Sequence, residues 1–288
     1  MACGGSSLKR SALLAAVAVL LVVQQASART WLTSLNAAQK RAKERKQLIF
    51  VDMFADWCGW CHKMEQEVFP SEAFQKATAD KVLLRLNTED GGEGTKLAQE
   101  FGVHSLPTFL VLTPEMTIAG VINGYFPASA VTKTMTTVED SYREFKKRVA
   151  NESSIAGDYR KRLDLATELR KHYALSDSEK RLRKLTQESG VPTDIRDEAW
   201  YQLAVTQAMA KKYDDSLKTL RDFAAVQSKG SAFERSRLLT GDIYVQQGNY
   251  AGAITEFRKF KQTFPNSPLV ANVDMVLPQL ERMTGKVQ

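Results

Sequence analysis

A near-continuous apolar run from Leu48 to Phe54 ends just before a closely spaced cysteine pair, Cys58 and Cys61. The run holds one charge, Asp52, and an apolar segment of this kind is typical of a central strand covered on both faces. A helix that starts near Gly59 would place Cys58 at its N-terminus, and Cys61 would lie on the same helical face about one turn further on. This order of strand, turn and helix restricts where the two sulfur atoms can lie.

The string Cys-x-x-Cys-His that ends at His62 is compatible with more than one chemistry. It is the attachment motif of a c-type haem, whereas Cys-x-x-Cys after a strand indicates a thiol redox site. A haem site does not require a buried strand with Asp52 before it. A zinc site needs four ligands, and the other histidines, His104 and His172, are far away in sequence. The sequence favours thiol chemistry and leaves haem as an alternative.

The predicted geometry gives the two cysteines different roles. Free backbone N–H groups and the helix dipole stabilise a thiolate at a helix N-terminus, so we expect a lowered pKa for the Cys58 thiol. Cys61 can then attack a mixed disulfide formed on Cys58. Burial would raise the pKa of Asp52, which could accept the proton that Cys61 loses. The alternative is that Asp52 is a structural residue at the end of a strand.

Pro107 follows Leu106 and precedes a predicted strand over residues 109–112. A proline at this position either begins the strand or lies in a tight turn with a cis peptide bond. A cis bond would leave a free backbone edge with which a substrate peptide could pair.

The first half of the chain alternates between predicted strands and helices. The strands are expected at residues 48–54, 82–86, 109–112 and 117–122, and the helices at residues 31–46, 59–69, 95–101 and 128–149. This alternation indicates an α/β layer structure. From about Ser153 onward the sequence predicts only pairs of helices.

The helical part contains an internal repeat with a spacing of 37 residues. The repeated positions are Ala204, Tyr213, Ser216 and Leu220, which recur as Gly241, Tyr250, Ala253 and Phe257. A helix pair that buries its apolar face only against its neighbours is a solenoid unit. The clearest repeats span about 198–231 and 235–268, and residues 163–185 are a candidate for an earlier pair. Pro278 is expected to end or kink the last helix.

Two families resemble this chain. The stretch from Phe50 to Cys61 resembles the active-site strand and helix of the thioredoxin family, and Leu106 to Phe109 resembles its cis-proline loop. Ala55 to Phe69 is particularly similar to the C-terminal thioredoxin-like domain of bacterial transmembrane thiol:disulfide interchange proteins. The helical part resembles tetratricopeptide repeats at Gly241, Tyr244, Gly248, Asn249, Tyr250, Ala253, Phe257 and Pro265. The resemblance implies an α/β thioredoxin-like domain, with a central mixed sheet flanked by helices, and then an all-α repeat domain.

The thioredoxin resemblance also implies roles for individual residues. Asp52 would be the buried acid, Cys58 the nucleophile, Cys61 the resolving thiol and Pro107 the cis proline. The residues expected to bind substrate are Trp57, Gly59, Trp60, Leu106 and Pro107. His62 stands where a lysine is common, and an imidazolium there would stabilise the thiolate, although a solvent-exposed histidine is equally compatible. The pair between the cysteines is Gly-Trp and not the Gly-Pro of thioredoxins, so the direction of electron flow does not carry over.

The N-terminus has the pattern of a secretory signal peptide. Lys9 and Arg10 precede an apolar run from Ala12 to Val23, and Ala26-Ser27-Ala28 is a small-residue cleavage site. The run of 12 residues is shorter than the roughly 18 needed to span a bilayer, but an uncleaved anchor is the alternative. Cleavage would remove Cys3 and lower the formal charge from +7 to +5, because Lys9 and Arg10 leave.

These observations predict a signal peptide at 1–28, a thioredoxin-like domain at 29–150 and a helical repeat domain at 151–288. We expect an exported, most simply periplasmic, thiol–disulfide oxidoreductase that needs no cofactor beyond its cysteine pair. Its partners would be protein dithiols or disulfides and a membrane or periplasmic thiol redox partner, and the repeats would dock a protein. The chain lacks a dense Lys/Arg run with interleaved aromatics, which argues against nucleic acid. A non-enzymatic scaffold is the alternative, although the retention of both cysteines argues against it.

Overall fold

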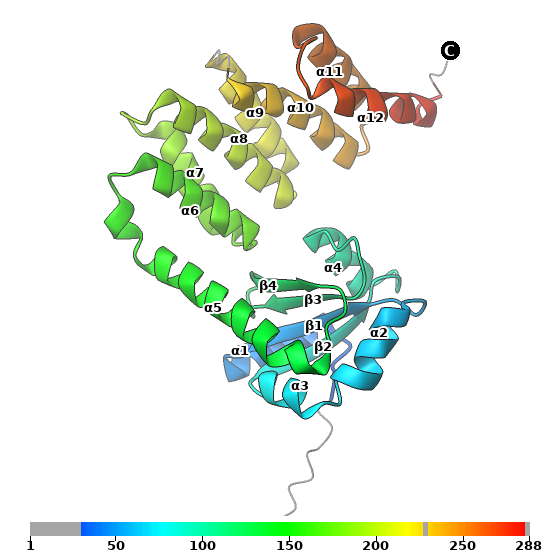
Figure 1. Ribbon diagram of the computed structural model, residues 1–288. Helices are drawn as coiled ribbons and strands as arrows, with labels where there is room; N and C mark the ends of the chain where they lie inside the picture. Colours follow the sequence, from blue (N-terminus) through cyan, green and yellow to red (C-terminus); the bar gives the residue numbers. More distant parts are fainter. Residues whose placement is uncertain (1–29, 227–229, 286–288) are drawn as a thin grey trace, which may run out of the picture. The chain divides into compact units, whose positions relative to one another are not determined.

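The computed structural model describes residues 30–226 and 230–285 (Figure 1). The predicted signal segment at 1–28 therefore lies outside the described residues. From Trp31 onward the chain forms one compact unit, so the predicted domain boundary at 150/151 stays a prediction. Within the described ranges, none of the helices has both the length and the apolar character needed to cross a membrane.

A mixed four-stranded sheet forms the centre of the N-terminal half, as predicted. Its strands, in the order β2-β1-β3-β4, are β1 (Leu48–Phe54), β2 (Lys81–Asn87), β3 (Thr108–Leu112) and β4 (Ile118–Asn123). β1 pairs with β2 in parallel and with β3 antiparallel, and β3 pairs antiparallel with β4. Strand β1 is interior to the sheet, which explains why its sequence is almost entirely apolar.

The two faces of the sheet bury separate apolar cores because successive side chains of a strand point to opposite faces. Phe50 packs with Met64, Val68 and Phe109 on one face. Val51 packs on the other face in a cluster that includes Ala38, Leu84, Leu97 and Leu110. The Val51 face is covered by two helices, α1 (Leu35–Arg45) and α4 (Glu93–Phe101). The Phe50 face is covered by α2 (Gly59–Lys63), the π-helical turn η1 (Met64–Val68), α3 (Glu72–Ala77) and α5 (Val131–Ala150).

The predicted helix at residues 31–46 begins later than expected. The Ser34 side chain accepts a hydrogen bond from the N–H of Ala37 and caps α1, which starts at Leu35. Leu32 pairs with β2 instead: its N–H donates to the carbonyl of Leu83 at 2.9 Å, and its carbonyl accepts from Arg85 N–H at 2.8 Å. The segment covers the outer edge of β2, which would otherwise be free for pairing with other chains.

Helix α3 was not predicted from the sequence. Ser71 caps it by accepting a hydrogen bond from the N–H of Phe74, whose side chain is fully buried. The helix has only six residues, too few to show a helical period. The predicted helix at 59–69 is present as α2 and η1 in direct succession.

The C-terminal half is all helical, as predicted. Its main helices are α6 (Tyr159–Lys171), α7 (Leu175–Gln187), α8 (Thr193–Met209), α9 (Tyr213–Ala225), α10 (Ser231–Gln246), α11 (Tyr250–Thr263) and α12 (Val270–Met283). The candidate early pair at 163–185 is formed by α6 and α7. Pro278 does not end the last helix, because α12 continues past it to Met283.

Three helix pairs share one packing pattern, in which a small residue of one helix lies against a large residue of the next. A Cβ atom on Gly241 would lie 2.3 Å from the ring of Phe257, so only glycine fits opposite this phenylalanine. The equivalent residues of the two earlier pairs are Ala166 with Leu182 and Ala204 with Leu220. In these two pairs the small residue is alanine, one methyl group larger than Gly241, and the large residue is leucine, which is smaller than Phe257. The close approach of the helices is therefore kept.

Candidate active site

Cys58 and Cys61 form a disulfide at the start of α2. Cys58 is the N-cap residue of the helix, and its Sγ accepts a hydrogen bond from the N–H of Cys61 at 3.2 Å. Cys58 and Cys61 are 3 % and 1 % exposed, so both residues of the disulfide are buried. Once the disulfide is reduced, this N–H group and the helix dipole would stabilise negative charge on Cys58.

Asp52 is almost fully buried, at 1 % exposure, in the middle of β1. It lies on the same face of the sheet as Phe50, which packs on Met64 and Val68 of the turn that continues the Cys61 helix. Its carboxylate accepts no hydrogen bond from the described residues. Burial is the largest influence and raises the pKa of Asp52 to about 7, although the nearby Arg85 lowers it. The group can therefore gain or lose a proton near neutral pH.

Arg85 and Glu65 complete the surroundings of Asp52, and the sequence did not predict either. Arg85 lies opposite Asp52 in the β1–β2 pairing, with its Nε 3.1 Å from Asp52 Oδ2. This is an ion-pair distance without hydrogen-bond alignment. The other guanidinium nitrogens donate to both oxygens of Glu65, at 2.6 and 3.0 Å, and these bonds hold the pKa of Glu65 below its usual value. One arginine thus connects the buried carboxyl to the helix that carries the cysteines.

The Leu106–Pro107 peptide bond is cis. The antiparallel register pairs Thr108 with Met53, so Pro107 lies beside the end of β1 that leads to the cysteines. Its carbonyl accepts a hydrogen bond from the N–H of Gly124 at 2.8 Å. Pro107 is buried and Leu106 half-buried.

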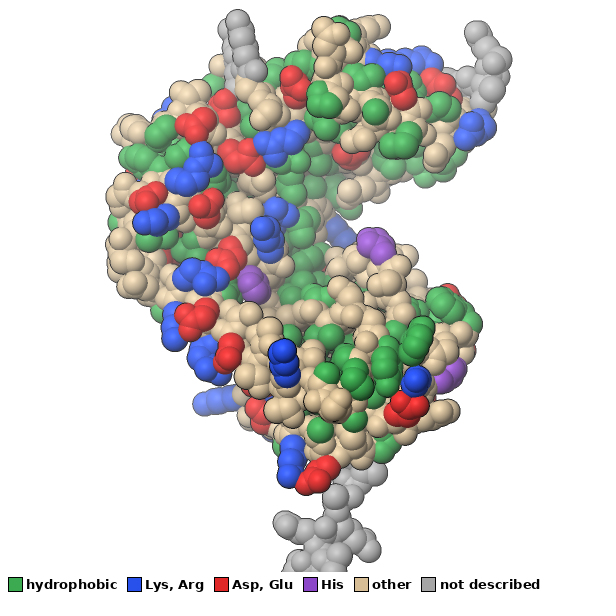
Figure 2. Space-filling model, in the orientation of Figure 1, with side chains coloured by type: hydrophobic (Ala, Val, Ile, Leu, Met, Phe, Trp, Pro, Cys, Tyr) green, Lys and Arg blue, Asp and Glu red, His purple; other side chains and the backbone are tan. Residues whose placement is uncertain are grey.

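Two exposed indoles lie close to the disulfide in the sequence: Trp57 precedes Cys58, and Trp60 lies between the two cysteines. Trp57 is 68 % exposed and Trp60 is 56 % exposed, and Trp57 Nε1 donates to Glu89 Oε1 at 2.8 Å. The space around Gly59 is open. Hydrophobic side chains gather on the surface where Figure 1 draws α2 (Figure 2). Large apolar side chains that stay exposed at such a place are typical of an interaction surface, and substrate binding by these residues stays a prediction.

The His62 ring is engaged away from the sulfur atoms. Its Nε2 lies 2.8 Å from the backbone oxygen of Asp56, and its Nδ1 lies 4.0 Å from Glu65. Its predicted role as a modulator of Cys58 stays a prediction. Over residues 30–226 and 230–285, the structure contains no group of three or more His, Cys, Asp or Glu side chains arranged to hold a metal ion.

Comparison with protein families matches two regions of the chain. Residues 35–139 match the model of the thioredoxin-like domain, and residues 235–267 match that of the tetratricopeptide repeat. The first region is a thioredoxin-like domain. It belongs to the thiol–disulfide oxidoreductase type and carries its redox pair at Cys58 and Cys61, which confirms the predicted enzyme class for this domain.

Curated relatives share part of this thioredoxin-like domain. The chain is 38% identical over 80 residues to the thiol:disulfide interchange protein DsbD of Yersinia enterocolitica, covering 27% of this chain and 14% of the relative. DsbD of Escherichia coli K12 is 38% identical over 77 residues, which is 26% of this chain and 13% of the relative. The chain therefore spans only a small part of the length of these relatives.

Solved structures also align with the thioredoxin-like domain. A thioredoxin from Thermus thermophilus aligns with 19% identity and a TM-score of 0.35, over 38% of this chain and 87% of that one. The oxidised C-terminal domain of Neisseria meningitidis DsbD aligns with 17% identity and a TM-score of 0.34, over 38% of this chain and 98% of that one.

Proposed function

We propose that this chain is an exported thiol–disulfide oxidoreductase that exchanges disulfides with protein substrates. The observation that carries the proposal is a Cys58–Cys61 disulfide at a helix N-terminus, above a strand whose buried Asp52 has a pKa of about 7. A disulfide that closes so short a loop constrains the unfolded chain little, so it contributes less to stability than a longer bridge. Reactivity is the better explanation for its presence.

In the reducing direction, the Cys58 thiolate attacks one sulfur of a substrate disulfide and releases the other as a thiolate. Cys61 then attacks the Cys58 sulfur, which breaks the mixed disulfide and releases the second substrate sulfur. Asp52 accepts the proton that Cys61 loses, directly or through water. The substrate gains two electrons and two protons, and the chain is left with its Cys58–Cys61 disulfide. The same steps in reverse oxidise a substrate dithiol.

The proposed partners are protein dithiols or disulfides and a membrane or periplasmic thiol partner that restores the cysteine pair. The relatives named thiol:disulfide interchange protein support this class of partner. The periplasm is the proposed location, and it depends on the predicted signal peptide at 1–28. The exposed indoles of Trp57 and Trp60 are the proposed contact surface.

The experiment that tests the proposed activity is the redox equilibrium of the cysteine pair in glutathione buffers. A pair that exchanges disulfides interconverts between dithiol and disulfide forms as the buffer changes. A purely structural disulfide stays oxidised in the same buffers.

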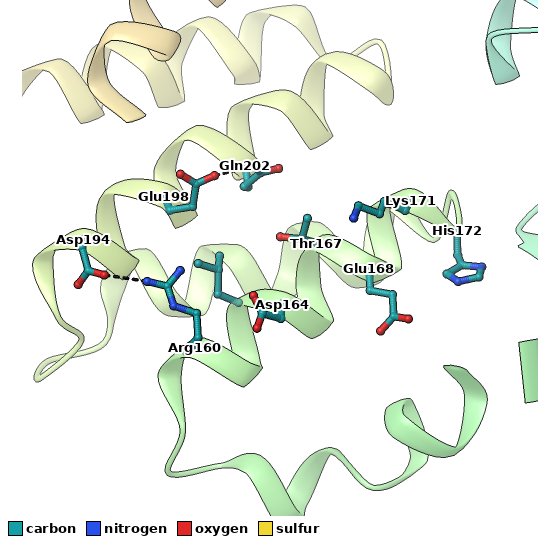
Figure 3. A pocket seen from close by; sticks show the side chains of 10 residues that line it. Arg160, Asp164, Thr167, Glu168, Lys171, His172, Asp194, Glu198 and Gln202 are labelled. Atoms are coloured by element: carbon teal, nitrogen blue, oxygen red, sulfur yellow. Dashed lines mark hydrogen bonds and ion pairs between the residues drawn. The ribbon is translucent and has the colours of Figure 1, made fainter. Parts of the chain in front are cut away.

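We further propose that the repeats dock a protein partner through a groove between α6 and α8. A cavity of about 680 Å³ is lined by Arg160, Leu163, Asp164, Thr167, Glu168, Lys171, His172, Asp194, Glu198 and Gln202. Figure 3 shows side chains of α6 and α8 facing one another across it, with the ion pair between Arg160 and Asp194, at 2.7 Å, near one end. Both charge signs line the groove, which suits a polar segment of a folded partner better than an apolar one.

Reversing one groove charge is expected to weaken this docking. Asp164 lines the groove, so Asp164→Lys should lower the exchange rate with the native protein partner several-fold, relative to the rate with glutathione. The matched control is Asp222→Lys on α9, which reverses a charge outside the groove lining. Stopped-flow exchange with both reactants measures the ratio. Equal ratios for the two variants would contradict docking in this groove.

A further inference from the structure

The Trp60 indole is held in place by residues that the sequence did not connect with the active site. Its ring centroid lies 5.2 Å from that of Tyr125, with 39° between the planes. The Lys63 Nζ lies 5.4 Å from the Trp60 centroid and 5.1 Å from the Tyr125 centroid, so one ammonium group contacts both rings. Glu67 completes the cluster: its carboxylate accepts from the Tyr125 hydroxyl at 3.1 Å and lies 3.9 Å from Lys63 Nζ.

The Tyr125 side chain is only half-buried, but the residues before and after it, Gly124 and Phe126, hold the backbone at this position. On one side, Gly124 adopts a φ of 80° and its N–H donates to the Pro107 carbonyl at 2.8 Å. A positive φ of this size suits glycine and few other residues. On the other side, Phe126 is buried in the core of the Phe50 face. The backbone on both sides of Tyr125 is therefore held, and its ring contacts Trp60 of α2.

The two sides of the disulfide differ in charge. Beside Trp60, the Lys63 ammonium is paired with Glu67 and contacts both rings, so the pair adds no net charge, while the two charged side chains stay 43 % and 53 % exposed. Beside Trp57, the Glu89 carboxylate accepts the indole N–H, and among the residues that the structure describes no basic side chain forms an ion pair with Glu89. A side chain that rests against Trp60 thus meets an aromatic face that Tyr125 already supports, in a cluster of zero net charge, which favours a bulky apolar group because little entropy is lost on binding.

We infer that Tyr125 and Lys63 determine partner specificity by positioning the Trp60 indole. The indole then provides a contact surface for a bulky apolar side chain next to the partner's reactive cysteine. This inference rests on the proposed exchange activity. It names the substrate class as protein segments in which an aromatic or large aliphatic residue neighbours the cysteine. Tyr125 and Lys63 act through Trp60 and do not take part in the bond exchange.

The test compares two disulfide-bonded peptides that differ only in the residue beside the cysteine, Phe in one and Ser in the other. With the unmodified full chain, kcat/KM should be roughly fivefold to tenfold higher for the Phe peptide, the effect of one good aromatic contact. Tyr125→Ala and Lys63→Ala should bring this ratio close to one, and Tyr125→Ala should leave the reduction potential of the cysteine pair unchanged. Tyr125→Phe keeps the ring and should keep most of the preference.

The matched control is Val121→Ala, because Val121 is an apolar side chain on β4 that is 45 % exposed and outside the cluster. It should leave the ratio unchanged. Exchange with glutathione without any Phe preference would overturn the inference and leave the proposed function standing. A changed potential in Tyr125→Ala would also overturn it, because the cluster would then act on the thiols. Absence of glutathione exchange in the unmodified chain would instead refute the proposed function.

Discussion

A Cys61→Ser chain is expected to accumulate a mixed disulfide through Cys58 when it meets a disulfide-bonded partner. The serine leaves Cys58 free to attack but removes the sulfur that resolves the intermediate. Most of the Cys61→Ser chain should shift to a higher mass on a non-reducing gel and return with reductant. The same experiment with the unmodified chain, in its dithiol form, should give only the resolved products.

Cys58→Ser is the control for this assignment. Cys61 is 1 % exposed, so without Cys58 the remaining thiol is poorly placed to reach a partner. This variant should trap little or nothing under the same conditions. If both variants trapped equal amounts of partner, the assignment of Cys58 as nucleophile and Cys61 as resolving thiol would be wrong.

Asp52→Asn is expected to slow the resolving step near neutral pH by roughly tenfold or more, since positioned proton acceptors contribute that much or more. In the unmodified chain the rate should rise as Asp52 ionises, with a midpoint close to its pKa of about 7. The asparagine cannot accept the proton, so this inflection should disappear. Single-turnover rates measured from pH 5 to 9 test the prediction. Superimposable pH profiles would exclude the acid/base role.

The same substitution should change how stability depends on pH. Because the pKa of Asp52 rises from 3.8 to about 7 on folding, the folded chain keeps a proton that the unfolded chain loses between these values. The contribution of Asp52 to the free energy of unfolding therefore falls as pH rises from about 4 to 7, by at most roughly 4 kcal/mol. Asparagine does not ionise, so the Asp52→Asn chain does not lose this stability as pH rises.

Urea unfolding of the disulfide-bonded forms at pH 4 and pH 8 measures this effect. Relative to the unmodified chain, Asp52→Asn should be more stable at pH 8 than at pH 4 by about 1 to 3 kcal/mol, allowing for the Arg85 ion pair that it loses. The difference between the two pH values separates ionisation from any packing change. Equal effects at both values would mean that Asp52 is not perturbed by burial.

Sequence patterns predicted most of the fold because its main elements have clear periodicity or clear ends. Strand β1 has the predicted bounds, since its apolar run follows Lys46 and Gln47 and ends two residues before Asp56. Helix α3 was too short to show a period, and Ser34 caps α1 later than the apolar pattern suggested. The early helix pair was detected only as a candidate because its second helix begins at Leu175, whereas the second helices of the later repeats begin at Tyr213 and Tyr250.

The candidate site was predictable only where its residues are neighbours along the chain. Cys58, Cys61 and Asp52 lie in one strand–turn–helix segment, so their relative places follow from local geometry. Arg85 reaches Asp52 through the register of two strands, and Tyr125 reaches Trp60 through a turn that follows β4. Such contacts depend on strand pairing and side-chain direction, which a single sequence does not specify.

Cys58 and Cys61 are expected to be a working redox couple, and a measurement of their reduction potential tests this expectation. The full chain would be equilibrated in glutathione buffers of graded ratio, and its dithiol and disulfide forms counted after the thiols are blocked. The account predicts a reversible two-electron transition, with a midpoint between roughly −270 and −120 mV, the range spanned by known exchange proteins. A pair that stays oxidised throughout, with a potential below about −300 mV, would be a structural disulfide and would contradict the account.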